Sequence, residues 1–572
     1  MFRTLLTPIV LTGAIAALLA PAAQADLGLN LLSNFSANIS GTGGGEVIAF
    51  DAFTSQLAVT RAQGAVPSDP SVVPAFGINL FNLADPSSPT SAGFVDFTNA
   101  FGSSASVASL TSVAIDPLGR GFGVAALVPA IGGTNTGYSV AGLLGFFDLN
   151  TGMSLGTLSL NDGTSKGYHP DSIVFSPDGS RIIVTNEGEF TAAATVQRPG
   201  SLGVIDISGI TLANKSTALA ALGTANVVVR DFSGVTPLLA GIRTNLGGTG
   251  AGIETAVQAM EPEFLTISGT QAFVTLQENN AVGTFDLVTN QWTAVRSLGT
   301  RSYLADTKND GIIKIDQAVN GMPMPDNISL RTYGATRYLF LASEGDARTD
   351  DADKMKGNQF GTAGFPTLDP SVTIPADQLL LEFSRVDGDT DLDGDIDVPT
   401  VFGGRGFLVV DADTGAVVYD SANPSNTNYL MVDLSQVIKS RDTLAGFTDS
   451  RSPAKGAEPE ALTIGDIDGV PYLFVGAERS NHIFMYNIAN PLDPVLVDVK
   501  RLVGTTAPTR PESFSFVPAS ENATGTPLLI VGYEGSTSAG ERIAVFQVPE
   551  PGSVAMLALG GLLVGGMRRR RG

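Results

Sequence analysis

The sequence of 572 residues contains no cysteine, two histidines and one tryptophan. Without cysteine the chain can form no disulfide, no thiolate metal site and no thiol nucleophile. The two histidines, His169 and His482, are too few for a zinc site built from several imidazoles, and they argue against a histidine-dependent catalytic triad. The fold must therefore depend on its apolar core, to which bound metal ions could add.

Positive charge is also scarce, because 33 Lys and Arg residues stand against 56 Asp and Glu residues, which gives a net charge of -23. Such a chain repels nucleic acid and attracts cations, so we expect no nucleic-acid partner. The content of 66 Gly and 32 Pro together with 43% hydrophobic residues indicates a turn-rich chain that can still build a large core.

Residues 1–25 predict a signal peptide. Arg3 precedes an apolar run from Leu5 to Ala20, and Ala23-Gln24-Ala25 follows with the small residues that signal peptidase requires. We expect cleavage after Ala25. The alternative, a buried N-terminal helix, is disfavoured because the run is short and ends in small residues.

The C-terminal segment 549–572 combines three elements in a fixed order. Pro549-Glu550-Pro551 comes first, an apolar stretch at 553–567 follows, and four arginines complete it. This order resembles the PEP-CTERM sorting signal of Gram-negative bacteria. The resemblance implies cleavage near Pro549, Glu550 and Pro551 by an exosortase-type membrane protease, transient inner-membrane association, and a final place at the cell surface or in the extracellular matrix. A permanent tail anchor is the alternative.

One unit recurs five times between the two ends. Each copy opens with Pro and an acid, continues as two apolar strands around a polar turn, and closes with Glu. The copies run 170–187, 262–278, 325–344, 459–478 and 511–534, and two weaker units lie at 47–83 and 112–149. Seven such units predict an all-β fold, a seven-bladed β-propeller with insertions. A tandem of irregular β-sandwiches is the alternative.

The segment 168–208 resembles the YVTN-type propeller repeat. The wider region 45–548 resembles the choice-of-anchor I family of bacterial surface domains, and several segments carry the likeness, among them NEGEF (186–190), SEGDAR (343–348) and the stretch 458–488. The resemblance implies a propeller-like fold and a surface location, with no established reaction. We therefore expect one domain at 26–548, with insertions near 209–260 and 345–403.

An acidic loop, DGDTDLDGDID, occupies 387–397 within the second insertion. Alternate carboxylates with a glycine between them have the spacing of a calcium-binding loop. Thr400 replaces the glutamate that ends an EF-hand loop, and Pro399 disfavours an outgoing helix, so a dockerin-like or isolated Ca²⁺ loop is expected. The predicted ligands are Asp389, Asp391, Asp393, Asp395 and Asp397. A solvated acidic turn is the alternative.

The acid that opens each repeat should lie near the Glu that closes its second strand, because a hairpin brings its two ends to one edge. The expected pairs are Asp171 with Glu187, Glu263 with Glu278, Asp326 with Glu344, Glu460 with Glu478, and Glu512 with Glu534, to which Asp346 and Arg348 are added. Crowded carboxylates need cations, arginines or backbone donors. Arg348, Arg479 and Arg510 could serve. We leave open whether this acidic rim binds metal or only fixes loops, and we expect His169 to be a loop residue.

Two functions remain after these observations. The first is a non-enzymatic binding or matrix module, stabilised by calcium, with an unidentified surface ligand. The second is a calcium-dependent phosphoesterase, resembling phytase or alkaline phosphatase, because clustered carboxylates can hold metal ions over a phosphate. A phosphate site also needs basic groups, for which Arg348, Lys354 and Lys356 are candidates.

Overall fold

The computed structural model describes eleven segments of the chain. They are 28–37, 47–63, 75–130, 140–188, 198–244, 255–312, 314–347, 353–423, 450–502, 508–535 and 541–548. The signal peptide predicted at 1–25 and the sorting segment predicted at 549–572 lie outside these residues, as does Arg348. Within the described segments, no helix has the length and apolar character needed to span a membrane.

The described residues contain seven four-stranded antiparallel sheets, most of them built from consecutive strands. The first comprises β2 (Ile48–Asp51), β3 (Gln56–Gln63), β4 (Ala75–Asn82) and β5 (Thr90–Asp96). The second comprises β6 (Val107–Ile115), β7 (Phe122–Pro129), β8 (Leu143–Asp148) and β9 (Ser154–Ser159). The third comprises β10 (Pro170–Phe175), β11 (Arg181–Asn186), β12 (Ser201–Asp206) and β13 (Val227–Asp231).

Four further sheets follow along the chain. The fourth comprises β14 (Pro262–Ser268), β15 (Gln271–Leu276), β16 (Ala281–Asp286) and β17 (Gln291–Ser297). The fifth comprises β20 (Ile328–Tyr333), β21 (Thr336–Ser343), β25 (Gly406–Asp411) and β26 (Val417–Asp420). The sixth comprises β27 (Pro459–Ile467), β28 (Val470–Ala477), β29 (His482–Asn487) and β30 (Val495–Lys500). The seventh comprises β31 (Pro511–Val517), β32 (Leu528–Tyr533), β33 (Arg542–Gln547) and β1 (Asn30–Ser36).

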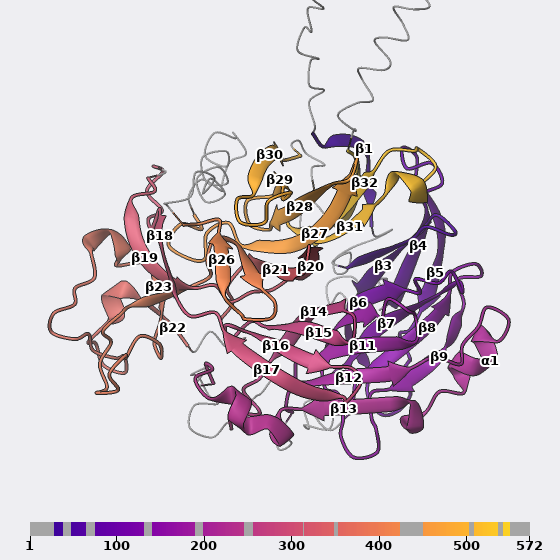
Figure 1. Cartoon of the computed structure of the whole chain (residues 1–572), viewed down its shortest axis with the longest axis horizontal. Coiled ribbons are helices and arrows are strands. Elements are labelled where there is room, and N and C mark those ends of the chain that lie inside the picture. The colour runs from indigo at the N-terminus through magenta and orange to yellow at the C-terminus, as the bar shows by residue number, and fades with distance from the viewer. Residues whose placement is uncertain are drawn as a thin grey trace, which may run out of the picture. The chain divides into compact units, whose positions relative to one another are not determined.

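The innermost strands of these sheets form a closed ring. In order, β2, β6, β10, β14, β20, β27 and β31 each contact the next strand, and β31 contacts β2. The sheets follow chain order in Figure 1, from the indigo strands β3–β5 through magenta to the orange and yellow strands β27–β32. The predicted all-β propeller fold is therefore confirmed, and the seven four-stranded sheets equal in number the repeats seen in the sequence.

The two ends of the described chain share one sheet. The N-terminal strand β1 pairs antiparallel with β33, and Ser36 lies opposite Arg542. The last sheet thus takes its outer strand from the start of the chain, which links the first and last repeats by backbone hydrogen bonds.

Apolar side chains fill the space between neighbouring sheets. Between the second and third sheets, Phe122, Leu144, Phe146, Ile182 and Ile205 are all fully buried in one cluster. The middle strands are buried on both faces, as in β7 and β8, because each sheet packs against one sheet on either side. This burial of apolar surface is the main stabilising contribution in a chain without disulfides.

The two expected insertions contribute regular structure. The strand β13 lies inside 209–260 yet completes the third sheet, and the helix α1 (Lys215–Ala220) lies in the same segment. The segment 345–403 supplies β22 (Lys354–Lys356), β23 (Glu382–Ser384) and β24 (Thr400–Phe402). These join β18 (Arg301–Ala305) and β19 (Gln317–Met322) in a five-stranded accessory sheet.

The ends of the second insertion cross at two glycines. Gly345 and Gly403 have φ values of 81° and 79°, in the left-handed region that favours glycine. A Cβ atom on Gly345 would lie 2.1 Å from the backbone nitrogen of Gly403, so any larger residue would force the strands apart. The accessory sheet is thereby attached directly beside Glu344.

Candidate functional site

A backbone feature at the start of several inner strands explains where the repeat acids lie. The residue before the opening proline has a left-handed φ in four repeats, at His169, Met324, Glu458 and Arg510. In three of these its carbonyl accepts a hydrogen bond from the amide of the closing glutamate, namely Glu187 (2.9 Å), Glu478 (2.8 Å) and Glu534 (3.0 Å). The hairpin ends are thus tied together, as the repeat pattern predicts.

A β-bulge then changes the direction of the opening acid. The register of the inner strand shifts directly after Pro170, Pro262, Pro459 and Pro511. A bulge bends a strand and re-aims a side chain that would otherwise lie in the ladder. The acid after each of these prolines, such as Asp171 or Glu460, therefore lines an internal space instead of packing between sheets.

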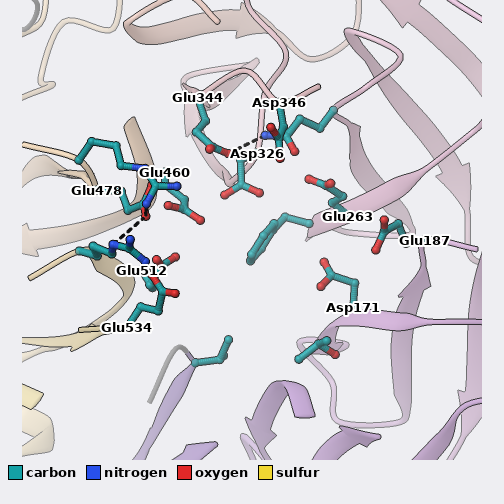
Figure 2. A pocket seen from close by; sticks show the side chains of 16 residues that line it. Asp171, Glu187, Glu263, Asp326, Glu344, Asp346, Glu460, Glu478, Glu512 and Glu534 are labelled. Atoms are coloured by element: carbon teal, nitrogen blue, oxygen red, sulfur yellow. Dashed lines mark hydrogen bonds and ion pairs between the residues drawn. The ribbon is translucent and has the colours of Figure 1, made fainter. Parts of the chain in front are cut away.

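The repeat acids surround a cavity of about 390 Å³. Figure 2 shows ten labelled carboxylates around one open space. They are Asp171, Glu187, Glu263, Asp326, Glu344, Asp346, Glu460, Glu478, Glu512 and Glu534. Ten of the twelve predicted rim residues thus line this cavity, whereas Glu278 is buried beside it without lining it. Arg479 and Arg510 line the same cavity, with Val47, Thr111, Phe264 and Gln277.

Lys455 neutralises one side of the cavity, and sequence reasoning missed it. Its ammonium group lies 3.0 Å from Glu344, 3.0 Å from Asp346 and 3.3 Å from Glu458. The lysine is only 8% exposed, which makes these charge-assisted contacts strong. The signal available in the sequence was its position three residues before Glu458, the acid that directly precedes a repeat, in a chain that has few lysines.

The two arginines act on the same side of the cavity. The Nε atom of Arg479 lies 3.2 Å from Glu458 and its Nη1 atom 2.5 Å from Glu478. Arg510 forms an ion pair with Glu534 and lies 3.7 Å from Glu478. Arg451 adds a further ion pair to Glu458. Positive charge therefore gathers around Glu458 and Glu478.

Three further carboxylates of the cavity keep an oxygen without a hydrogen bond from any described residue, as does Glu278 beside it. Among the described residues, no partner is found for the buried Oε2 of Glu263, Oδ2 of Asp326 or Oε2 of Glu460. Asp326 is only 6% exposed. A buried charged oxygen without a donor is costly, so these groups require a proton or a cation.

The pKa values of these acids depend on burial and on the charges of their neighbours. Burial and the neighbouring Glu344 raise the pKa of Asp326 well above its usual range, and burial with Glu512 does the same for Glu460. Burial and Glu512 raise the pKa of Glu478 to about 9. Glu458 differs, because Lys455, Arg451 and Arg479 lower its pKa against the effect of burial.

His169 lies at the edge of this region. Its Nδ1 atom is 3.2 Å from a carboxylate oxygen of Glu187, and its left-handed backbone forms the turn before Pro170. It is thus a loop residue that contacts one rim acid. Lys354 and Lys356 lie on β22 and do not line the cavity, and the Nζ atom of Lys354 is 3.9 Å from Glu382.

The acidic loop forms a second cluster, between β23 and β24. Carboxylate oxygens of Asp389, Asp391 and Asp397 lie within 4.8 Å of one another, and Asp369, Asp395 and Asp397 form an adjoining trio. Asp393 belongs to neither trio, so the five predicted ligands do not all converge on one point. Sequence reasoning missed Asp369, whose neighbour Leu368 pairs with Ile396 through an isolated bridge.

Hydrogen bonds already fix part of this loop. Asp397 accepts hydrogen bonds from the backbone and hydroxyl of Thr390, each at 2.7 Å, and these lower its pKa. Asp389 accepts from the amides of Leu392 and Gly394. Partial desolvation and the adjacent Asp393 raise the pKa values of Asp391 and Asp395. Oxygen ligands of this kind suit a hard cation such as Ca²⁺.

Comparison with known families identifies the propeller region. The model of the choice-of-anchor I domain matches residues 47–491. The chain belongs to the choice-of-anchor I family. A PEP-CTERM protein-sorting motif matches residues 547–571, so this choice-of-anchor I protein carries the signal for exosortase processing and is exported to the cell surface. The predicted resemblances to the choice-of-anchor I family and to the PEP-CTERM signal are therefore confirmed.

Individual relatives of this choice-of-anchor I protein are distant. Gigasin-3a of Magallana gigas is 28% identical over 156 residues, which is 24% of this chain and 55% of that protein, so the match spans about half of the relative. Hydrazine synthase of Kuenenia stuttgartiensis is similar in structure at 10% identity, with a TM-score of 0.43 over 90% of this chain and 99% of that one. A periplasmic gluconolactonase of Pseudomonas aeruginosa has 11% identity and a TM-score of 0.40 over 82% and 88% of the respective chains.

Proposed function

We propose that this protein is a cell-surface binding module whose axial cavity takes a cationic ligand. One observation carries the proposal: ten carboxylates line the cavity, whereas two arginines are the basic residues among its described lining. Lys455 neutralises part of this excess from one side. The other carboxylates are crowded at low dielectric, so a cation that replaces their protons would be bound favourably.

The other residues that line the cavity favour a binding function over catalysis by a hydroxyl nucleophile. Thr111 is the hydroxyl-bearing residue among the described lining, and its Oγ1 atom donates to the carbonyl of Pro170 at 2.6 Å. A hydroxyl engaged in this way is a poor nucleophile, because activation needs an adjacent base. The acids, by contrast, converge from five different sheets on one space.

Calcium at the loop 387–397 forms a second part of the proposal. The fit is supported by the trio of Asp389, Asp391 and Asp397, whose oxygens are close enough to share one ion. Ca²⁺ prefers several carboxylate oxygens in a flexible arrangement. Since the loop joins β23 to β24, an ion there would stabilise the accessory sheet.

The export route completes the proposed function. Signal peptidase would remove residues 1–25, the apolar segment at 553–567 would hold the chain in the inner membrane for a time, and exosortase processing near Pro549-Glu550-Pro551 would release it. The mature protein would then display the acidic cavity at the surface or in a matrix, to a ligand that carries positive charge.

Binding of an inert trication tests the cavity assignment. Hexaamminecobalt(III) offers positive charge but does not exchange its ligands, so it reports electrostatic binding alone. We expect calorimetry on the full-length protein to detect it, and we expect weaker binding after the paired change Glu460→Gln and Glu512→Gln. A control with Asp286→Asn, a surface acid on β16 outside the cavity, should bind like the unchanged protein. Equal binding by all three proteins would refute the proposed cavity function.

Metal-dependent hydrolysis of a phosphoester is the second candidate. The observation in its favour is that Arg479 and Arg510 line the cavity together with the carboxylates, a combination that phosphate recognition uses. A screen with phytate and simple phosphoesters, with and without Ca²⁺, tests it. Turnover that chelation and Glu344→Gln both abolish would replace the binding function with an enzymatic one.

A further inference from the structure

We infer that the axial cavity holds a divalent metal ion at the carboxylates of Asp326, Glu344 and Glu460. This inference rests on the proposed cation binding and specifies its ligand. One carboxylate oxygen from each of the three residues lies within 4.8 Å of the others, close enough to share one ion. Asp326 and Glu344 come from the two ends of the β20–β21 hairpin, and Glu460 from β27 in the next sheet, so the site bridges two sheets.

The side chain of Asp326 gives independent support for a ligand. It is 94% buried, since only 6% of its surface is exposed, and its Oδ2 atom has no hydrogen-bond partner among the described residues. Figure 2 shows its carboxylate directed into the cavity, facing Glu460. A buried carboxylate oxygen without a hydrogen-bond donor is stabilised by a nearby cation.

Glu344 is already held in position as a ligand. Gln277 donates to its Oε2 atom at 2.8 Å, and Lys455 contacts its Oε1 atom at 3.0 Å. Each carboxylate oxygen can accept more than one contact, so both remain able to bind a metal. A neutral neighbour such as Gln277, which fixes the orientation of a ligand, typically strengthens metal binding, whereas the charge of Lys455 opposes it.

The distribution of positive charge explains why the ion would sit here. Lys455, Arg479 and Arg510 contact Glu344, Glu458, Glu478 and Glu534. By contrast, Oδ2 of Asp326 and Oε2 of Glu460, like Oε2 of Glu263, have no hydrogen-bond partner among the described residues. The protein therefore supplies its own cations to Glu344, Glu458, Glu478 and Glu534, and a metal ion would complete the neutralisation at Asp326 and Glu460.

The chemistry of the ligands defines the class of metal. All three are carboxylates, and the described lining of the cavity contains neither histidine nor cysteine. Oxygen ligands of this kind select hard divalent ions such as Ca²⁺, Mg²⁺ or Mn²⁺ over zinc or copper. Three carboxylates leave coordination positions for water or for an anionic group, which Arg479 and Arg510 could also contact.

Manganese provides the probe for this site, because its EPR signal reports direct coordination. The full-length protein should first carry Asp389→Asn and Asp397→Asn, so that the acidic loop does not contribute. We expect one tightly bound Mn²⁺ per chain, and binding at least about tenfold weaker after Asp326→Asn or Glu460→Gln. Glu534→Gln is the matched control, since it removes one charge from the same cavity but lies outside the trio, and it should change affinity far less.

The outcomes separate this inference from the proposed function. If hexaamminecobalt(III) binds and Mn²⁺ does not, the metal site is wrong and cationic binding stands. If neither ion binds, both the metal site and the proposed function fail.

The variants test the position of the metal ion. An equal loss of Mn²⁺ affinity in Glu534→Gln and Asp326→Asn would mean general electrostatic attraction without a coordination site. A loss confined to Glu512→Gln would place the ion in the neighbouring trio of Glu460, Glu478 and Glu512 and overturn the assignment. Circular dichroism of each variant checks folding, and Glu460→Gln provides a second test if Asp326→Asn does not fold.

Discussion

The ammonium nitrogen of Lys455 lies 3.0 Å from a carboxylate oxygen of Glu344, with both side chains buried near the axis of the propeller. Lys455 thus acts as a fixed internal cation in a cavity that otherwise attracts external ones. Burial alone would lower the pKa of this lysine, but Glu344, Glu458 and Asp346 raise it well above its usual value. The lysine therefore stays charged and competes with any bound cation.

Replacement of Lys455 tests this competition. In Lys455→Gln, we expect Mn²⁺ affinity to rise, because Glu344 and Asp346 lose their internal counter-charge. The metal-free protein should lose about 3 kcal/mol of unfolding free energy, the cost of breaking a buried ion pair. Calorimetry with Mn²⁺ and urea unfolding in EDTA measure the two effects. Weaker Mn²⁺ binding in this variant would mean that Lys455 orders the ligands more than it competes with the metal.

The pH dependence of stability provides a second test. Glu478 has its pKa raised to about 9, and the pKa values of Glu263, Asp326 and Glu460 are also raised by burial and neighbouring acids. The folded state therefore holds protons that the unfolded chain releases near its ordinary carboxyl pKa of about 4.3. Without divalent ions, this contribution to stability is complete below that pH and is lost as the pH rises toward about 9.

The measurement is urea unfolding in EDTA across this range of pH. Glu458 makes a contribution of the opposite sign to the pH dependence of stability. Its lowered pKa adds stability above the ordinary pKa of a glutamate, and this stability is lost as the pH falls. Saturating Ca²⁺ should reduce the decline in unfolding free energy at high pH, since a metal ion stabilises the ionised carboxylates. An unfolding free energy that increases from pH 5 to pH 9 in EDTA would contradict the assigned pKa shifts.

The acidic loop yields a third prediction with an internal control. Ca²⁺ bound to the acidic loop should raise Tm by stabilising the accessory sheet. The double change Asp389→Asn and Asp397→Asn should abolish this contribution to the rise in Tm. Asp393→Asn removes a similar charge from the same loop but belongs to neither carboxylate trio, so most of the rise should remain. Calorimetric melting with and without Ca²⁺ compares these variants. An equal effect of Asp393→Asn would indicate a diffuse acidic turn.

Arg405 is the basis of a fourth prediction, on stability alone. It is 1% exposed, and its guanidinium donates to the carbonyls of Asp306 (3.0 Å), Ser452 (2.7 Å) and Ala454 (2.7 Å). In Arg405→Met, two buried carbonyls and one partly buried carbonyl lose a donor, which should cost about 3 kcal/mol at roughly 1 kcal/mol each. Urea unfolding measures the change, and Arg405→Lys, which keeps one donor group, should lose less.

The sequence predicted the repeated part of the site because its cause is local. Each acid pair follows from one hairpin, so Asp326 and Glu344, or Glu460 and Glu478, could be paired from the repeat alone. Lys455 could not be placed, since it lies 111 residues from Glu344 in the sequence and outside the repeated unit. Its position depends on how the segment before β27 packs against the second insertion, which no periodic sequence pattern encodes.

The same distinction applies to the acidic loop and to the sheets. Spacing alone identified the aspartates at 389–397. Asp369 lies outside this sequence pattern, and it reaches the cluster because its neighbour Leu368 forms an isolated β-bridge with Ile396. The strand β13 was hidden within 209–260 because a helix and irregular turns separate it from β12. Likewise, the partner of β1 lies at the opposite end of the chain, where only tertiary structure brings the two together.

The pairing of β1 with β33 has a mechanical consequence for a surface protein. The sorting motif matches from residue 547, directly at the end of β33, so any pull on that end of the chain reaches this strand first. β33 is hydrogen-bonded to β32 on one side and to β1 on the other. Tension would have to shear two ladders at once before the ring could open. Deleting β1 would leave one ladder, and the same force should then unravel the propeller from its last sheet.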